Sequence, residues 1–390
     1  MQDKLKLPVY LDYNATTPVD EQVFAKMTPY FTTIFGNAAS RDHRFGWDAQ
    51  ESVEDARDEI ASLINAIGME IIFTSGATES VNLAIKGVVE KYKSKGSHII
   101  TSIIEHRAVL DTCKRLEQQG FKVTYLPVDH EGNIDLQQLE DIITSETILI
   151  SIMYANNEIG TIYPVSEIGE IAHKHGAIFF TDATQAVGKI PVDVQSDQID
   201  LAAFSAHKIY GPKGMGALFI RNKNPKVEIV PQMDGGGHER GLRSGTLNVS
   251  GIVGFGEACR IAKAEMQKDM ERLSGLREKL ENSILPILPE VYVNGNRKNR
   301  LPHVTNMSFK YIESKDLMRA MPDIAVSSSS ACTSASEDPS YVLKALGIPY
   351  ELIHSAIRFS LGRFTTEVDI DYTIDTVVKS VKRLREIQTF

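Results

Sequence analysis

Residues 177–221 read AIFFTDATQAVGKIPVDVQSDQIDLAAFSAHKIYGPKGMGALFIR, and this stretch contains three short apolar runs separated by polar segments. The runs are AIFFTD (177–182), LAAFSA (201–206) and GALFIR (216–221), and four comparable runs precede them: EIIFTS (70–75), SHIITS (97–102), KVTYLP (122–127) and TILISIMY (147–154). Strands that are apolar on both faces and alternate with helix-like segments are typical of parallel sheets covered by helices. The sequence therefore predicts an α/β fold with a mostly parallel central sheet between helix layers.

The pattern changes near residue 250. Apolar residues at steps of three and four predict one long helix over Ile252–Ile284. The apolar stretches PEVYVNG (289–295) and HVTNMSFK (303–310), followed by a helix from Asp369, suit a smaller α+β unit. We therefore expect a large domain of residues 19–264 and a small domain made of residues 1–18 and 265–390, with the long helix linking the two.

Composition narrows the classes of partner. The chain has 390 residues and a formal net charge of -9, which argues against direct nucleic-acid binding and against an anionic membrane surface. No apolar run approaches the roughly 18 residues of a membrane span, and no apolar stretch follows the first lysines. The three cysteines (Cys113, Cys259 and Cys332) lie far apart, which predicts neither a disulfide framework nor a metal site. A cytoplasmic location follows as an expectation.

Polar residues follow several of the predicted strands. In α/β sheets, ligands bind at the carboxyl ends of the parallel strands, so these residues are the candidates for a site. They are Thr78 in GATES (76–80), His106 in EHRAV, Asn156 and Asn157 in NNEIG, and Asp182 and Gln185 in DATQ. Each alone is typical of a solvated loop, a turn or a helix cap, but all of them are expected at one edge of the sheet. GATES precedes a predicted helix, whose free N–H groups suit a phosphate.

Lys208 is a candidate nucleophile. It follows the run LAAFSA and is flanked by Ser205 and His207, whereas Lys213 in the Gly-Pro turn looks more exposed. A lysine becomes nucleophilic when its amine is desolvated or placed near positive groups. A reactive lysine, a phosphate cradle and an aspartate able to hold a pyridinium proton together indicate a pyridoxal 5'-phosphate (PLP) site.

Cys332 lies in SSSSACTSAS (327–336), ten residues without a charge, an aromatic ring or a large aliphatic side chain. Such a composition is typical of a solvated loop. A free cysteine is more often a small buried hydrophobe, and an exposed one is an oxidation liability. Either this cysteine has no special role or its thiol must travel.

Eight motifs in this order resemble the cysteine desulfurases of the NifS/IscS type, which are fold-type I, class V aminotransferase-like enzymes. The motifs are GATES, EHRAVL, NNEIG, DATQAVGK, SAHKIYGPKG, GGGHERGLRSGT, SSACTSAS and IRFSLGRFT. The resemblance runs from LDYNATTP to the C-terminal helix. It implies a PLP-dependent enzyme that removes sulfur from L-cysteine, leaving L-alanine and a persulfide on Cys332.

The resemblance also implies roles for single residues. Lys208 would hold PLP covalently, Asp182 would bind the pyridine nitrogen, and His106 would stack on the ring and take part in catalysis with Lys208 and Cys332. Gln185 and Asn157 would form hydrogen bonds with PLP on the side of its phenolic oxygen. Arg358, with Asn157, would bind the substrate. The cofactor phosphate would be held by Ala77, Thr78, Ser205 and His207, with Thr246 reaching in from the second subunit of a homodimer.

Two departures from the family pattern concern the acceptor and the serine segment. Ser329 stands where the family commonly has glycine, and the chain ends at REIQTF, before the extended tail with which assembly-system members hold their scaffold partner. Which acceptor protein takes the sulfur, such as an iron–sulfur scaffold or a tRNA thiolation protein, stays open. A selenocysteine lyase, another class V PLP enzyme, or a non-catalytic scaffold with this fold remain the alternatives. The cysteine in its serine segment favours the desulfurase.

Overall fold

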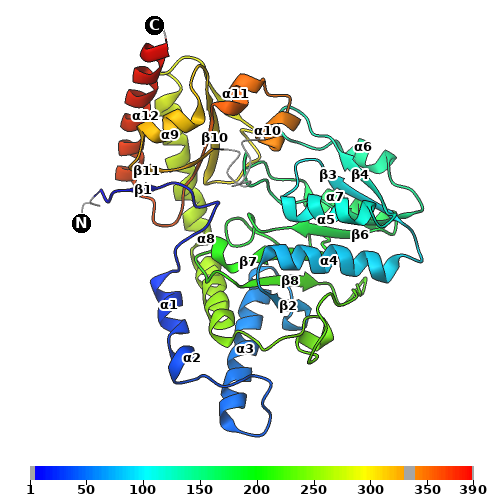
Figure 1. Cartoon of the computed structure of the whole chain (residues 1–390). Coiled ribbons are helices and arrows are strands. Elements are labelled where there is room, and N and C mark those ends of the chain that lie inside the picture. The colour runs from blue at the N-terminus through cyan, green and yellow to red at the C-terminus, as the bar shows by residue number, and fades with distance from the viewer. Residues whose placement is uncertain (1–4, 329–338, 389–390) are drawn as a thin grey trace.

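The computed structural model describes residues 5–328 and 339–388, and the seven apolar runs form one seven-stranded sheet (Figure 1). The strands are β2 (Ile71–Thr74), β3 (His98–Ser102), β4 (Lys122–Leu126), β5 (Thr147–Ser151), β6 (Ile178–Asp182), β7 (Leu201–Ser205) and β8 (Gly216–Ile220). Their order is β2-β8-β7-β6-β5-β3-β4. All neighbouring pairs from β7 to β4 are parallel, and only β8 runs antiparallel to both of its neighbours. The predicted mostly parallel sheet is confirmed.

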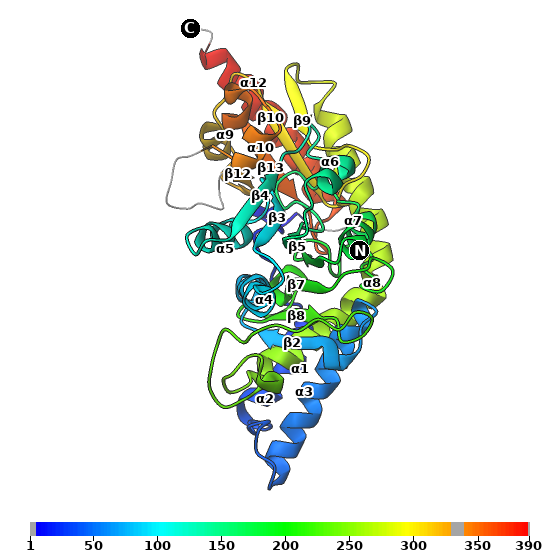
Figure 2. The ribbon, with the colours of Figure 1, turned by 90° about the vertical axis from the view of Figure 1, so that its right-hand side faces the viewer.

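Helices cover both faces of this sheet, as Figure 2 shows from the side. The neighbours Phe179 and Phe180 illustrate why, because both are fully buried but point into different cores. One core is closed by α4 (Ala77–Tyr92) and α5 (Arg107–Glu117). The other is closed by α3 (Arg44–Leu63), α7 (Val165–Lys174) and the first part of α8 (Val249–Ile284). The smaller α6 (Leu136–Asp141) packs at the edge, and α1 (Glu21–Met27) and α2 (Pro29–Thr32) lie against α8.

A second sheet, of four strands, has the order β12-β13-β10-β9 and its own core. Its strands are β9 (Val291–Asn294), β10 (Val304–Phe309), β12 (Ser327–Ser328) and β13 (Ala356–Ser360). The N-terminal strand β1 (Val9–Tyr10) pairs with β11 (Ile324–Ala325), which brings the start of the chain to this unit. Helices α9 (Ser314–Ala320) and α12 (Glu367–Gln388) pack into the core of this sheet. The short helices α10 (Tyr341–Ala345) and α11 (Tyr350–His354) instead place their buried residues in a core of the large sheet.

The long helix α8 joins the two parts. Its first turns pack into the core of the large sheet through residues such as Phe255, whereas Leu273 and Leu280 belong to the core of the small sheet. The helix begins three residues before the predicted start because the Asn248 side chain accepts a hydrogen bond from the Gly251 N–H, at 3.1 Å, and so caps the helix there. Within the described ranges, no helix is long and apolar enough to cross a membrane.

Candidate active site

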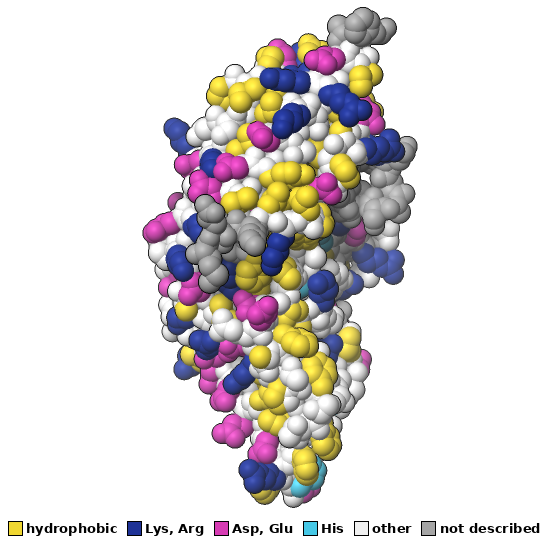
Figure 3. All heavy atoms as spheres, turned by 90° about the vertical axis from the view of Figure 1, so that its left-hand side faces the viewer, with side chains coloured by type: hydrophobic (Ala, Val, Ile, Leu, Met, Phe, Trp, Pro, Cys, Tyr) yellow, Lys and Arg dark blue, Asp and Glu magenta, His cyan; other side chains and the backbone are white. Residues whose placement is uncertain are grey.

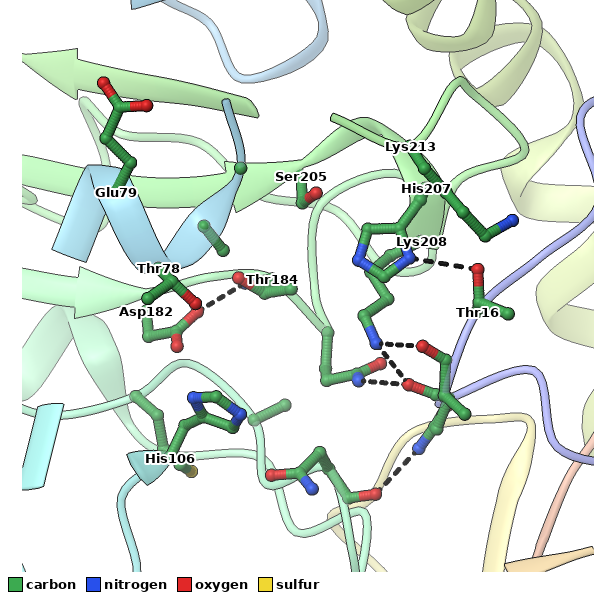
Figure 4. A pocket seen from close by; sticks show the side chains of 18 of the residues that line it. Thr16, Thr78, Glu79, His106, Asp182, Thr184, Ser205, His207, Lys208 and Lys213 are labelled. Atoms are coloured by element: carbon green, nitrogen blue, oxygen red, sulfur yellow. Dashed lines mark hydrogen bonds between the residues drawn. The ribbon is translucent and has the colours of Figure 1, made fainter. Parts of the chain in front are cut away.

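A cavity of about 630 Å³ opens at the carboxyl ends of the strands of the large sheet (Figure 4). Its volume lies in the range of small-molecule sites. Ten of the predicted site residues line it: Ala77, Thr78, His106, Asn157, Asp182, Gln185, Ser205, His207, Lys208 and Arg358. Thr246 does not line it, and Cys332 lies outside the described residues. The structure therefore brings together the predicted residues that follow the strands, except Asn156, which is fully buried and accepts the N–H groups of Glu158 and Ile159 instead of lining the cavity.

One end of the cavity is suited to a phosphate. Helix α4 begins at Ala77, so its first N–H groups lie at the cavity wall together with Thr78. Gly216 allows this turn to approach β8, because a Cβ at Gly216 would lie 2.6 Å from the Cα of Gly76. Burial, with Lys208 and Lys213 nearby, lowers the pKa of His207 to about 4, so its imidazole is neutral near pH 7.

Lys208 comes from the short 3-10 turn after β7 and lines the cavity, and its amine points to the N-terminal segment (Figure 4). The Nζ atom donates to the carbonyl oxygens of Asn14, at 2.5 Å, and Ala15, at 2.7 Å. The neighbouring Thr16 hydroxyl lies 3.1 Å from the His207 ring nitrogen Nδ1. The N-terminal segment is thus a wall of the site that our sequence reasoning did not assign, although the run of small polar residues in LDYNATTP was a usable signal.

Asp182 and His106 lie on the side of the cavity away from Lys208 (Figure 4). Asp182 ends β6, is largely buried, and accepts the Thr184 N–H at 3.0 Å. The Thr184 hydroxyl is buried without a hydrogen-bond partner among the described residues. His106 caps α5, and its Nδ1 accepts the Ala108 N–H at 3.1 Å. This bond leaves Nε2 as the nitrogen available for a ligand.

Arg358 lies at another wall of the cavity, on strand β13 of the small sheet. Its side chain is only 4% exposed. It donates from Nη2 to the Asp12 carboxylate at 2.8 Å and from Nη1 to the Asn157 carbonyl at 3.1 Å. Its Nε is buried and has no hydrogen-bond partner in the part of the chain that the structure describes. An orphaned charged donor at a cavity wall suits a carboxylate ligand.

Gln185 is oriented by a residue that our sequence reasoning gave no role. Its Oε1 accepts from the Lys189 amine at 2.6 Å, and its Nε2 donates to the Asn14 carbonyl at 3.2 Å. Desolvation, with the charges of Lys208 and Arg358, lowers the pKa of Lys189 well below its usual value. The amide of Gln185 therefore has a defined direction at the cavity wall.

The loop that carries Thr246 is attached to the outside of the phosphate end. Arg57 of α3 and Glu239 form a buried ion pair at 2.8 Å, and the Glu239 carboxylate also accepts the Phe73 N–H of β2 at 2.7 Å, so this loop is fixed to the large sheet. Arg243 binds Glu79 of the first turn of α4 at 2.8 Å. Thr246 itself is exposed. Its own chain therefore does not bring it into the cavity.

Comparison with known proteins agrees with this architecture. Residues 9–373 match the model of the aminotransferase class-V family. The chain is 58% identical over 385 residues to the cysteine desulfurase IscS of Escherichia coli O139:H28, covering 98% of this chain and 95% of that protein. A solved NifS-like protein has a TM-score of 0.89 and 38% identity over 96% of this chain and 99% of its own. The structure of SspA in complex with cysteine has a TM-score of 0.81 and 38% identity, covering 92% and 100%.

The chain therefore belongs to the class-V aminotransferase family, whose members depend on PLP. Within that family it is one of the cysteine desulfurases of the NifS/IscS type, since the identity extends over nearly its whole length.

The cavity fits PLP on its own chemistry. It offers a helix N-terminus and the hydroxyls of Thr78 and Ser205 for a phosphate, and an amine on Lys208 for an aldehyde. On the far side from Lys208, it offers the carboxylate of Asp182 for a ring nitrogen (Figure 4). The cofactor predicted from the sequence is thus the one that the family uses.

Proposed function

We propose that the chain removes sulfur from L-cysteine, releasing L-alanine and leaving the sulfur on Cys332 as a persulfide. The observation that supports this most is a cavity that combines a PLP site with an orphaned donor on Arg358. One of the similar solved structures holds cysteine. PLP, when bound, supplies an electron sink that labilises the Cα proton and then the Cβ–S bond of the substrate.

The residues of this chain divide the work. Lys208 holds the cofactor covalently and moves the Cα proton, for which its amine lies at the cavity wall. Asp182 would keep a proton on the ring nitrogen of PLP, and His106 would stack on the ring, with Nε2 as the nitrogen that its helix cap leaves available for proton transfer. The phosphate is held by the start of α4 with Thr78, Ser205 and His207. Gln185 and Asn157 bind the phenolic oxygen side, and Arg358 binds the substrate carboxylate.

The burial of the other two cysteines supports Cys332 as the sulfur acceptor. Cys113 and Cys259 are fully buried, and burial raises the pKa of the Cys113 thiol to about 12 and that of the Cys259 thiol well above its usual value. Neither lines the cavity. Ser327 does line it, and this residue stands five positions before Cys332 in the sequence.

The sulfur step balances without an outside oxidant. The Cys332 thiolate attacks the substrate sulfur, so that an S–S bond forms while the Cβ–S bond breaks. The bonding electrons stay with the three-carbon fragment, which takes up a proton and leaves as alanine. One substrate cysteine and one protein thiol thus give one alanine and one protein persulfide.

We further propose a homodimer in which Thr246 completes the phosphate site of the partner subunit. Two observations support it. The first is that Thr246 is exposed and does not line the cavity of its own chain. Hydrophobic side chains also gather over the α1 to α3 region (Figure 3). Its exposed aromatic residues are Phe24, Phe31, Phe35, Phe45 and Trp47. An exposed apolar patch of this kind is typical of a protein interface.

The proposal also includes the limits of the two domains, the cellular location of the protein and the protein that accepts the sulfur. Within the described part of the chain, the core of the small sheet contains only residues from the start of the chain (Val9 and Leu11) and from Leu273 onward, which supports a large domain of residues 19–264 and a small domain of residues 1–18 and 265–390. Where the two domains meet, residues such as Val342 and Leu343 pack into the core of the large sheet. The free thiols of Cys113 and Cys259 suit a reducing, cytoplasmic compartment. The acceptor of the persulfide is another protein, such as an iron–sulfur scaffold or a tRNA thiolation protein.

A direct test is to add L-cysteine to the purified protein and measure alanine and sulfide with a reductant present. We expect the two products in equal amounts, together with a change in the visible band of the cofactor. A protein that lacks a visible cofactor band and yields no alanine would instead support a non-catalytic scaffold. A much higher rate with L-selenocysteine than with L-cysteine would favour the selenocysteine lyase alternative.

A further inference from the structure

Pro339 is the first described residue after the segment that contains Cys332. The next two residues, Ser340 and Tyr341, contact the loops that follow β5 and β3 in the active site. The upstream end of that segment is fixed by β12, in which Ser327 pairs with Arg358. Backbone pairing fixes this upstream end, whereas side chains hold the downstream end. Those side chains are not part of the cavity wall.

The first downstream contact joins Ser340 to Glu158. The Ser340 hydroxyl lies 2.6 Å from the Glu158 Oε2, and its oxygen accepts the Leu343 N–H at 3.1 Å, which caps α10. A hydroxyl can donate once while it accepts, so both bonds are satisfied together. Glu158 is only 2% exposed and directly follows Asn157 of the cavity. The contact is therefore a buried link to the loop after β5.

The second downstream contact joins Tyr341 to the loop after β3. The Tyr341 hydroxyl donates to the Glu105 carbonyl at 2.6 Å, and Glu105 directly precedes His106. The Arg107 guanidinium lies 4.5 Å from the centre of the Tyr341 ring, a cation–π distance. The Glu105 side chain is fully buried and accepts the Met153 N–H at 2.7 Å, so this loop is also tied to the one after β5.

From these contacts we propose that Ser340 and Tyr341 are positioning residues for the sulfur-transfer step. Each fixes the chain downstream of Cys332 to a neighbour of a cavity residue: Ser340 through Glu158, next to Asn157, and Tyr341 through Glu105, next to His106. The two bonds set where the downstream end of the sulfur-accepting segment lies relative to the cavity. This inference rests on the proposed role of Cys332.

The substitutions that remove these bonds are small. Tyr341→Phe removes one hydroxyl and keeps the ring under Arg107, whereas Ser340→Ala removes both the bond to Glu158 and the cap on the Leu343 N–H. Ser340→Thr keeps a hydroxyl and a helix cap, so it should restore the behaviour of the wild type. Tyr350→Phe is the matched control, because Tyr350 is 70% exposed on the next helix.

The readout must separate cofactor chemistry from sulfur transfer. With the holoenzyme and L-cysteine in a single turnover, the change in the visible band reports the early steps, and alkylation with mass spectrometry reports persulfide on Cys332. We expect Tyr341→Phe and Ser340→Ala to keep the visible change, the KM for cysteine and the PLP content, and to form persulfide about 2- to 10-fold more slowly, as one lost hydrogen bond implies. Ser340→Thr and Tyr350→Phe should match the wild type.

Two outcomes would count against different claims. Persulfide formation at the wild-type rate in both Tyr341→Phe and Ser340→Ala, or an equal slowing of the visible change, would overturn the positioning role. A wild type that turns over cysteine without placing sulfur on Cys332 would instead overturn the proposed function. Thermal unfolding of each variant distinguishes a positioning effect from loss of fold, since a variant that melts like the wild type but transfers slowly supports the inference.

Discussion

Replacing Arg358 by lysine should weaken cysteine binding while leaving PLP binding intact. The guanidinium already gives Nη2 to Asp12 and Nη1 to the Asn157 carbonyl, and its buried Nε remains for the substrate carboxylate. A lysine amine keeps the charge and has three N–H donors, but all three leave from one nitrogen, so it cannot reproduce the separate positions of Nη1, Nη2 and Nε and would be drawn toward Asp12. The loss of a charge-assisted bond costs about 1.5 to 3 kcal/mol, or roughly 10- to 100-fold in affinity.

The assay is the KM for L-cysteine, together with the dissociation constant measured from the visible band in a Cys332→Ala background, where turnover is blocked. Arg363→Lys is the matched control, because Arg363 lies on the same segment but pairs with Asp269, at 3.0 Å, and Asp20, at 3.3 Å, outside the main cavity. An unchanged KM in Arg358→Lys, or an equal rise in Arg363→Lys, would refute this assignment of the carboxylate site.

Three further predictions concern the cofactor lysine, the dimer and a buried acid. Lys208→Ala should lose turnover, and borohydride reduction of the wild type should label Lys208; label on Lys189 or Lys213 in peptide mapping would contradict this. Mixing Lys208→Ala and Thr246→Val chains should recover about a quarter of the wild-type activity, since each hybrid dimer keeps one intact site; a fully active monomer in light scattering would exclude shared sites. Burial raises the pKa of Glu158 from 4.5 to about 7. Its carboxyl therefore ionises more readily in the unfolded chain, and the stability of the wild type relative to Glu158→Gln should fall as pH rises from 4.5 to 7. Urea unfolding at several pH values measures this difference, and a flat or rising difference would contradict the raised pKa.

The sequence predicted the large sheet well because its signals are local. Runs such as AIFFTD and LAAFSA are apolar on both faces, and β6 and β7 are indeed buried on both faces of the sheet. Parallel strands share one carboxyl edge, so Thr78, His106, Asp182 and Lys208 were expected to meet, and they line one cavity. The start of α8 was less predictable, because the cap at Asn248 depends on a single side chain.

The remainder of the site depends on contacts between residues far apart in the chain. Asp12 reaches Arg358 because the N-terminal segment pairs with β11 and, at Asp12 itself, with Ser360 of β13. The buried acids Glu105 and Glu158 look like ordinary loop residues in sequence, and their burial follows from how α10 closes over them. No periodic pattern or spacing reports such pairings. The role given to Cys332 came from the family resemblance, and that residue lies outside the described ranges.

The most direct test of the account is the fate of sulfur in Cys332→Ala. This variant should keep its visible cofactor band and its early response to L-cysteine, yet release neither alanine nor sulfide at a useful rate. In the wild type, cyanolysis after one turnover should release about one sulfur per chain, mapped to Cys332. Cys113→Ala and Cys259→Ala should remain active, because both thiols are buried away from the cavity. Full activity of Cys332→Ala, or sulfur mapped to Cys113 or Cys259, would contradict the account.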